Sequence, residues 1–249
     1  MPGEDVDQLR RAWEQHGQSD PLWAILTESG KRGGRWDASA FFATGRDEIA
    51  SLMRTLDSYG VPGRHVRALD FGCGVGRLTE ALADHFELVD GVDISDAMIA
   101  RAREGSAHPD GCRYHVNARG DLRLFDDGTF DLAHSSIVLQ HVGRDLARSY
   151  LAELVRVLRP GGVLHVQLPT TPRWNVGGIV VRLLPAALMN RLRGGMRMEG
   201  IPEPDVRALL EREGLTLLEV APDGSAGERW NSRRYTARKP EVAGGASRS

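Results

Sequence analysis

Three closely spaced glycines and the carboxylate before them form the most informative cluster in the sequence. Residues 68–77 read Ala-Leu-Asp-Phe-Gly-Cys-Gly-Val-Gly-Arg. Because this stretch follows a short apolar run and precedes a helical pattern, it predicts a strand, a tight turn and a helix. Glycines let the backbone of such a turn approach a ligand closely, and Asp70 can meet a cationic group there. A turn of this kind is also typical of an ordinary connection between a strand and a helix.

A second carboxylate, Asp93, ends the next apolar run of the sequence. It lies about twenty residues after the first glycine, where a carboxylate can accept hydrogen bonds from a ribose diol. Asp93 could instead cap the following helix, but Ser95 or Asp96 can serve that purpose. The dinucleotide fingerprint does not fit, because its third glycine position is occupied by Arg77.

The elements that must position these residues alternate between strand and helix. Strands are predicted at 66–71, 88–94, 112–116, 130–135 and 163–168, with helices at 77–85, 96–103 and 145–158. A helix at 202–214 and two last strands at 215–220 and 230–238 follow. The alternation predicts an α/β fold with a doubly wound, mostly parallel sheet and helices on both faces. Ligands of such sheets bind at the carboxyl ends of the strands.

Two further segments flank or interrupt this core, which spans residues 61–240. Residues 1–60 predict an N-terminal helical cap, with Asp20 as N-cap of a short helix and Asp37 as N-cap of a longer one. Residues 170–200 are apolar and basic and break the rhythm of the sheet. We expect them to form an inserted lid over the site, although a dimer contact or a helix packed on the core would show the same pattern. Residues 241–249 are small and polar and predict a disordered tail.

Four motifs in order resemble those of the class I, Rossmann-like S-adenosylmethionine-dependent methyltransferases. They are Leu69–Gly76, Val92–Ser95, Phe130–Ser135 and Val157–Gly162. The likeness extends from about residue 66 to residue 239. It implies a seven-stranded sheet whose last strand is antiparallel, with S-adenosylmethionine as cofactor.

The resemblance also implies roles for individual residues. Asp70 and the loop formed by Gly72, Cys73, Gly74 and Gly76 would face the methionine part of the cofactor. Asp93 would hold the ribose hydroxyls, Ile94 would pack on the adenine, and the backbone near Ser135 would border the sulfonium. The family often has an acid after the third strand, where this chain has Asn117 and Ala118. We expect Asn117 to take that place, with Asp121 as the alternative. Arg46 could reach the ligand from the helical cap or could simply be solvated.

His141 is the candidate catalytic residue. It follows the fourth predicted strand, beside the place expected for the methyl group. Histidine is the usual side chain for removing a proton near neutral pH. A histidine bonded to the backbone at the start of the next helix would occupy the same position. The sequence shows no metal-ligand spacing, so no metal is expected.

Composition narrows the classes of partner. The chain has 249 residues, a formal net charge of −2 and two cysteines, and its N-terminus lacks the apolar core of a signal peptide. Composition therefore predicts a cytoplasmic protein with no membrane segment. The resemblance implies an enzyme that transfers methyl groups to oxygen or nitrogen of a small molecule such as a secondary metabolite, and a homodimer is an open alternative. An RNA methyltransferase or nucleic-acid-binding protein is the alternative, since Arg182, Arg191, Arg193 and Arg197 could form a basic patch. A nicotinamide-dependent oxidoreductase would have the same kind of parallel sheet and glycine-rich turn. The glycine spacing at residues 72–77 does not match its fingerprint.

Overall fold

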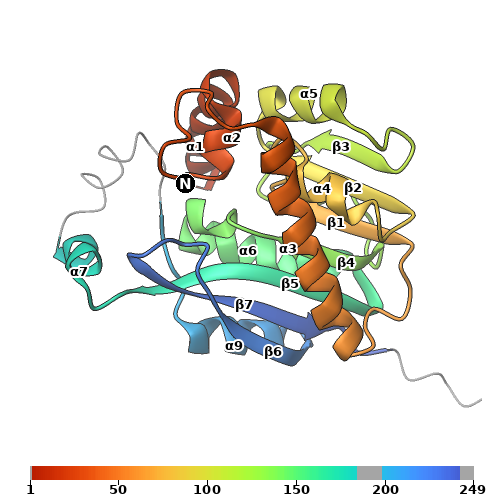
Figure 1. The fold of residues 1–249 in the computed structure, drawn as a ribbon. Helices are drawn as coiled ribbons and strands as arrows, with labels where there is room; N and C mark the ends of the chain where they lie inside the picture. The colour runs from red at the N-terminus through yellow and green to blue at the C-terminus, as the bar shows by residue number, and fades with distance from the viewer. Residues whose placement is uncertain (1, 184–197, 242–249) are drawn as a thin grey trace, which may run out of the picture.

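The computed structural model describes residues 2–183 and 198–241. Within these ranges a seven-stranded sheet forms the centre of the molecule, in the order β3-β2-β1-β4-β5-β7-β6 (Figure 1). The strands are β1 (Arg67–Phe71), β2 (Leu88–Asp93), β3 (Cys112–Val116), β4 (Phe130–Ser135), β5 (Leu158–Pro172), β6 (Thr216–Asp223) and β7 (Trp230–Arg238). β1 to β5 are parallel, whereas β7 is antiparallel to both β5 and β6. The predicted sheet with its antiparallel last strand is confirmed.

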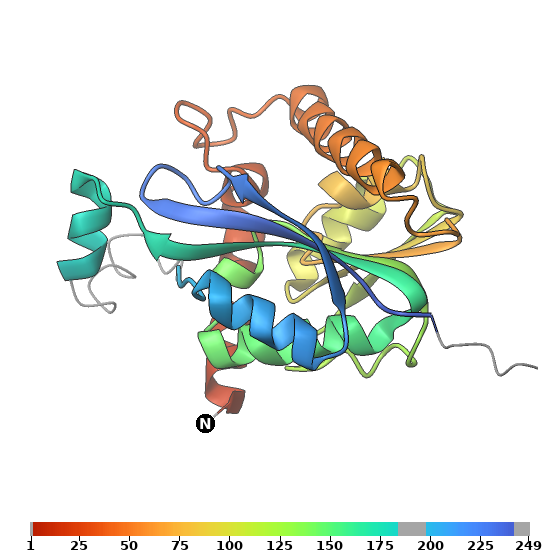
Figure 2. The same cartoon turned by 90° about the horizontal axis from the view of Figure 1, so that it is seen from below.

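Helices cover both faces of the sheet, as Figure 2 shows most clearly. One face carries α3 (Ala38–Ser58), α4 (Arg77–Leu82) and α5 (Asp96–Gly105), and the other carries α6 (Arg144–Val157) and α9 (Glu203–Arg212). Neighbouring strand residues point to opposite faces. Ala68 therefore packs in the cluster beneath α3 and α4, while Leu69 packs in the cluster beneath α6 and α9. Because both faces are buried, the central strands are apolar at successive positions.

The N-terminal residues form α1 (Pro2–Ser19) and α2 (Pro21–Ile25), which lie beside α5 at one end of the sheet (Figure 1). α1 docks through Glu14, whose carboxylate accepts hydrogen bonds from Ser95 Oγ at 2.8 Å and Ala97 N–H at 3.1 Å. A carboxylate at the N-terminus of α5 is favoured by the exposed N–H groups there.

The two predicted N-caps behave differently. Asp37 caps α3 as expected, since it accepts from Ala40 N–H at 2.8 Å. Asp20 precedes α2 but its side chain makes no cap hydrogen bond. Its carboxylate accepts instead from Gly33 N–H at 2.5 Å and Gly34 N–H at 3.2 Å. Asp20 thus occupies the predicted N-cap position, with Pro21 opening the helix, but its side chain binds the glycine-rich loop instead of the helix N–H groups.

The predicted insertion starts later than expected. β5 begins directly after α6 and continues to Pro172, which pairs with Trp230 of β7. Residues 170–172 therefore belong to the sheet. α7 (Val176–Leu183) follows beyond the carboxyl end of β5 (Figure 1). Residues 184–197 of the predicted lid and residues 242–249 of the predicted tail lie outside the described residues. No helix among the described residues is long and apolar enough to cross a membrane.

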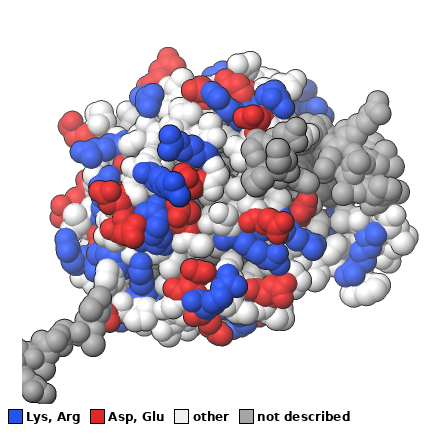
Figure 3. All heavy atoms as spheres, turned by 180° about the vertical axis from the view of Figure 1, so that it is seen from behind, with Lys and Arg blue, Asp and Glu red and all other residues white. Residues whose placement is uncertain are grey.

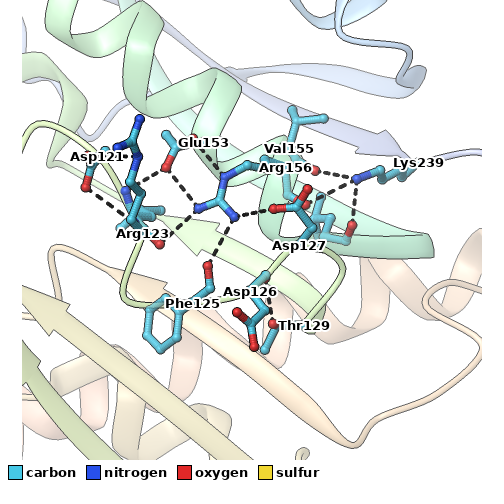
Figure 4. Close-up of polar contacts among 12 residues, drawn as sticks. Asp121, Arg123, Phe125, Asp126, Asp127, Thr129, Glu153, Val155, Arg156 and Lys239 are labelled. Carbon is cyan, nitrogen blue, oxygen red and sulfur yellow. Dashed lines mark hydrogen bonds and ion pairs between the residues drawn. The ribbon is translucent and has the colours of Figure 1, made fainter.

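A polar cluster around Arg156 of α6 holds the chain between β3 and β4 in place (Figure 4). Arg156 donates to both carboxylate oxygens of Glu153, to Asp127 at 2.6 Å, and to the carbonyls of Leu122 and Phe125. Glu153 and the other partners raise the pKa of the Arg156 guanidinium against the effect of burial. The cluster fastens residues 122–127 to α6, on the face opposite α3.

Candidate active site

The carboxyl ends of β1 and β4 form the switch point of the sheet, because the chain moves outward to β2 from one and to β5 from the other. The glycine loop, residues 72–76, leaves β1 at this point. A second loop, residues 136–143, leaves β4 and contains the short helix η1 (Leu139–His141). A ligand site is expected between these two loops.

The glycine loop is packed closely against its neighbours. Gly72 N–H donates to the carbonyl of Val92 at 2.7 Å. Gly72, Gly74 and Gly76 all have positive φ, a conformation that glycine adopts without strain. A Cβ at Gly74 would lie 2.6 Å from Cδ1 of Ile25. Glycine is needed here both for the turn and for the close approach of α2.

Asp93 links the end of β2 to the glycine loop. Its two carboxylate oxygens accept from Gly74 N–H and Ser95 N–H, each at 2.9 Å. Burial raises the pKa of the Asp93 carboxyl to about 6 in spite of these hydrogen bonds. Ser95 is the side-chain cap of α5, since its Oγ accepts from Met98 N–H. Asp93 is thus not needed as a cap.

An inner cavity of about 80 Å³ lies over the glycine loop. Its walls include Leu9, Trp13, Ile25, Asp70, Gly72, Cys73, Gly74, Arg77, Asp93, Ile94, Met98, Asn117, Ser136, Ile137 and Val138. Asp70 is 1% exposed. Its carboxylate accepts from Thr79 Oγ1 at 2.7 Å and lies 3.7 Å from Nδ1 of His134. Asp70 is therefore already engaged at the floor of the cavity.

The candidates for the position after β3, Asn117 and Asp121, lie differently relative to the inner cavity. Asn117 lines the inner cavity, whereas Ala118 and Asp121 are not among its lining residues. The Asn117 side-chain oxygen accepts from Arg119 N–H at 3.1 Å, and its amide donates to the Asp121 carbonyl at 2.7 Å. The Asn117 side chain is thus held locally by the turn that follows β3.

Two further predicted residues are buried at or near the loop. Ser135 is fully buried and its Oγ donates to the Phe71 carbonyl at 3.0 Å. The next residue, Ser136, faces the inner cavity instead. Cys73 is buried in the glycine loop, and burial raises the pKa of its thiol well above the usual value. Cys73 is therefore a packing residue rather than a nucleophile.

Arg46 is another predicted site residue that does not line the inner cavity. It is exposed on α3 and lines a separate hollow with Glu80 and Asp84. Its neighbour Gly45 faces the core, and an added Cβ there would collide with the Arg77 carbonyl. Each helix residue is rotated by about 100° from the last. The contact at Gly45 therefore turns Arg46 away from the inner cavity.

A larger outer cavity of about 700 Å³ lies beyond the inner one. It is lined by Trp23, Ala24, Ile25, Leu26, Thr27, Glu28, Trp36, Thr44, Glu48, Arg77, Ile137, Gln140, His141, Met198, Ser225, Ala226 and Gly227. Ile25, Arg77 and Ile137 line both cavities. The described lid residues Trp174, Ile179, Val180 and Leu183 line neither, and Trp174 is 82% exposed. These four residues thus border neither cavity, and a lid over the site stays a prediction.

His141 lies on the wall of the outer cavity. Its Nε2 is 3.2 Å from the Gln140 side-chain nitrogen, and its ring meets Trp13 edge-on at 5.3 Å between centroids. Trp13 also lines the inner cavity. The loop after β4 thus brings His141 close to Trp13 on the wall of the inner cavity, and its catalytic role stays a prediction.

Glu48 was not identified from the sequence. One carboxylate oxygen accepts from Arg77 at 2.8 Å and the other from Ser136 Oγ at 2.7 Å. Burial opposes ionisation of Glu48, but Arg77 and His134 hold the pKa of its carboxyl below the usual value. The sequence does contain a signal for Glu48. Thr44 and Glu48 are spaced i, i+4 along one edge of the apolar stripe of α3, which predicts that they lie on the same side of the helix.

Comparison with known proteins identifies the family. Residues 69–166 match a family described as a methyltransferase domain. The ubiquinone biosynthesis O-methyltransferase of Xanthomonas campestris is 30% identical over 193 residues, covering 73% of this chain and 74% of that protein. The trans-aconitate 2-methyltransferase of Deinococcus radiodurans is 38% identical over 127 residues, and the chain spans about half of that relative, 46% of its length.

The solved structures agree on the fold. The magnesium protoporphyrin IX methyltransferase of Synechocystis, with S-adenosylhomocysteine bound, superposes with a TM-score of 0.63 at 21% identity, covering 92% of this chain and 97% of that one. A fold of this kind with a glycine loop at the switch point defines a class I, Rossmann-like methyltransferase. The chain belongs to the S-adenosylmethionine-dependent methyltransferases, and its cofactor is S-adenosylmethionine.

Proposed function

We propose that the chain methylates a hydroxyl group of a small, largely apolar molecule held in the outer cavity. One observation carries the proposal. The inner and outer cavities share Ile25, Arg77 and Ile137, so groups held in the two cavities meet at these three side chains. Methyl transfer needs donor and nucleophile to be held in line with water excluded.

The inner cavity would hold the cofactor. Asp93 would accept hydrogen bonds from the ribose hydroxyls, and Ile94 and Asn117 would border the adenine. Asp70 and the glycine-loop backbone would face the methionine part, near the end of β4 at Ser135. Bound S-adenosylmethionine supplies a methyl group activated by its sulfonium.

The inner cavity must widen to admit this ligand. Its volume of about 80 Å³ is below the roughly 300 Å³ at which small-molecule sites begin. Ile25 and Val138 stand directly over the glycines. We therefore expect α2 and the loop after β4 to shift when the cofactor enters.

The outer cavity would hold the acceptor. Trp23, Trp36, Leu26 and Met198 give it apolar walls, while Glu48 and His141 are polar groups on the same wall surface. Such a cavity suits a molecule that is mostly apolar and carries a hydroxyl group. His141 would act as general base and take the hydroxyl proton on Nε2. The acceptor oxygen would gain the methyl group as the methyl–sulfur bond breaks, and S-adenosylhomocysteine would be the leaving group.

Several relatives support oxygen as the methylated atom. They include the ubiquinone biosynthesis O-methyltransferase and the malonyl-[acyl-carrier protein] O-methyltransferase of Salmonella typhimurium, the latter 38% identical over 96 residues. Both names specify O-methylation. The nicotinamide alternative is excluded by the family.

The RNA-methyltransferase alternative gains no comparable support. Arg182 is occupied locally, since it donates to the Pro172 carbonyl at 2.7 Å and stacks over Trp174. Arg191, Arg193 and Arg197 lie outside the described residues. On the face shown in Figure 3, the visible basic and acidic side chains are interspersed.

The test is transfer of radiolabelled methyl groups from S-adenosylmethionine to a panel of phenols, aliphatic alcohols, carboxylic acids, amines and RNA. We expect labelled product from apolar hydroxyl compounds. Added S-adenosylhomocysteine should inhibit this transfer, because it competes with S-adenosylmethionine for the cofactor site. Label transfer to amines or RNA without transfer to any hydroxyl compound would contradict the proposal.

A further inference from the structure

We propose that Gln167 is a positioning residue that fixes the loop after β4 and, through Gln140, decides which ring nitrogen of His141 carries the proton. Gln167 lies on β5 and is 2% exposed. Its side chain contacts the loop of residues 136–143 on one side and β7 on the other. The consequence for catalysis rests on the proposed role of His141, whereas the hydrogen-bond pattern does not.

The first contact is with a strained residue. Ile137 has φ of +63°, the one positive value among the described non-glycine residues. The left-handed region is unfavourable for a β-branched side chain. Ile137 N–H donates to Gln167 Oε1 at 3.0 Å. This hydrogen bond helps to hold Ile137 in the conformation that places its side chain where the two cavities meet.

The orientation of the Gln167 amide is fixed from both ends. At one end, a backbone N–H can only donate, so Gln167 must present its oxygen to Ile137. At the other end, Ser232 Oγ donates to the Asp223 carboxylate at 2.6 Å, so it accepts from Gln167 Nε2 at 3.1 Å. Asp223 is in turn paired with Arg234 at 2.9 Å. Both ends therefore require the same amide orientation.

This orientation propagates to His141. The Gln167 amide nitrogen also faces Gln140 Oε1, at 3.5 Å. Gln140 consequently turns its own nitrogen toward His141 Nε2, at 3.2 Å. An amide nitrogen donates and cannot accept. This contact therefore favours the neutral tautomer of His141 in which Nε2 is unprotonated and Nδ1 carries the proton.

The relay prepares His141 for the role proposed above. The partner of one ring nitrogen sets the tautomer of a histidine. With Nε2 unprotonated, the ring is ready to take a proton at that atom. A hydroxyl group of the acceptor would replace the Gln140 amide as hydrogen-bond donor to Nε2. Gln140 thus keeps the basic nitrogen free of a proton until the acceptor binds.

The experiment reads the tautomer directly. Protein labelled with ¹⁵N-histidine is observed by NMR at alkaline pH, and the His141 resonances are assigned by their loss in His141→Asn. We expect an unprotonated Nε2 in the wild type. Gln140→Leu and Gln167→Met should shift the His141 signals toward a mixture of tautomers. Thr170→Val is the matched control: it removes a buried hydrogen bond of β5, to the Asn231 carbonyl, and should leave the His141 signals unchanged.

A protonated Nε2 in the wild type, or an unchanged tautomer in Gln140→Leu, would overturn the proposal. Gln140 lies outside the sheet, so its variant tests the last link even if Gln167→Met fails to fold. Gln167→Glu adds a check, because it can still accept from Ile137 N–H but cannot donate to Gln140. With a known acceptor, turnover in Gln140→Leu should fall by roughly 10-fold or more with the KM for S-adenosylmethionine near wild type. Failure of S-adenosylhomocysteine to bind would count against the proposed function alone, because the tautomer is read without it.

Discussion

Arg156 and Arg77 are both paired with glutamates, Glu153 and Glu48, yet they serve different purposes. Arg156 makes five hydrogen bonds to protein groups and joins one loop to α6 (Figure 4). Arg77 is more deeply buried, with 4% of its side chain exposed, and its Nε has no partner among the described residues. Arg77 lies on the wall of both cavities, whereas Arg156 lines neither.

The difference lies in where hydrogen-bonding capacity is left over. Around Arg156 the donors are saturated, so this cluster can contribute only to folding. Around the cavities a donor is left over, because Arg77 Nε has no hydrogen-bond partner among the described residues. Buried groups of that kind are costly unless a ligand uses them. Variants in the two regions should therefore separate stability from function.

The largest effect is expected at His141. A positioned general base contributes about 10²–10⁴-fold, so His141→Ala should lower turnover by that factor while S-adenosylhomocysteine affinity stays near wild type. Steady-state kinetics with an identified acceptor measures this. His141→Asn is the control, because it keeps a hydrogen bond but cannot take the proton near neutral pH. Nearly full turnover in His141→Asn would mean that the residue only orients the acceptor.

Arg156→Met should have the opposite profile. It leaves Glu153 and two carbonyls without their donor, so the free energy of unfolding should fall by roughly 2–3 kcal/mol. Thermal unfolding should show a loss of roughly 4–12 °C, with unchanged S-adenosylhomocysteine affinity at low temperature. Arg148→Met, at an exposed arginine of the same helix, should cost less than about 1 kcal/mol. If Arg156→Met and Arg148→Met lost equal free energy of unfolding, the Arg156 cluster would contribute no more to stability than an exposed ion pair.

Asp93→Ala tests the cofactor side of the site. Losing hydrogen bonds to a charged acceptor costs about 1.5–3 kcal/mol each, so S-adenosylhomocysteine should bind at least about tenfold more weakly in calorimetry. Asp96→Ala, at the exposed carboxylate three residues further on, is the matched control and should bind as the wild type does. Unchanged affinity in Asp93→Ala would remove the ribose assignment.

The smallest effect is expected in how protein stability and S-adenosylhomocysteine binding depend on pH through Asp93. Burial raises the pKa of Asp93 to about 6, from 3.8. Between these values the folded protein holds a proton that the unfolded chain has lost, so stability contributed by Asp93 falls as pH rises through this window. We propose that S-adenosylhomocysteine binding uses the Asp93 carboxylate, so binding should instead weaken as pH falls below about 6. Denaturation and calorimetry across the window check both signs, and Asp93→Asn should abolish both trends.

Much of the fold could be predicted because it depends on local patterns. The strand at 112–116, the strand at 130–135 and the last strand at 230–238 have the bounds that the sequence predicted. Their apolar runs and flanking turn residues are sufficient signals. The extension of β5 to Pro172 was missed because its pairing with β7 is a long-range contact, which periodicity along the chain does not contain.

The candidate site divides in the same way. Asp70, Asp93 and the glycine loop occur in a motif, and the structure brings them to one cavity. Arg46 was misplaced because its orientation depends on the crossing of α3 over α4 at Gly45. Glu48 and Gln167 were missed for a related reason. The hydrogen bonds that give each its role are made with residues more than twenty positions away in the sequence.

The narrow junction between Ile25 and Ile137 also bears on cofactor engineering. These two side chains and Arg77 are the residues that line both cavities. Shortening Ile25 to alanine would widen the passage and remove the packing of its Cδ1 over Gly74, while leaving Asp93 in place. Cofactor analogues whose sulfonium carries an allyl or propargyl group then become candidate alkyl donors for this chain. Competition between such an analogue and S-adenosylmethionine, compared in wild type and Ile25→Ala, would show whether the size of the transferred group is set at this one position.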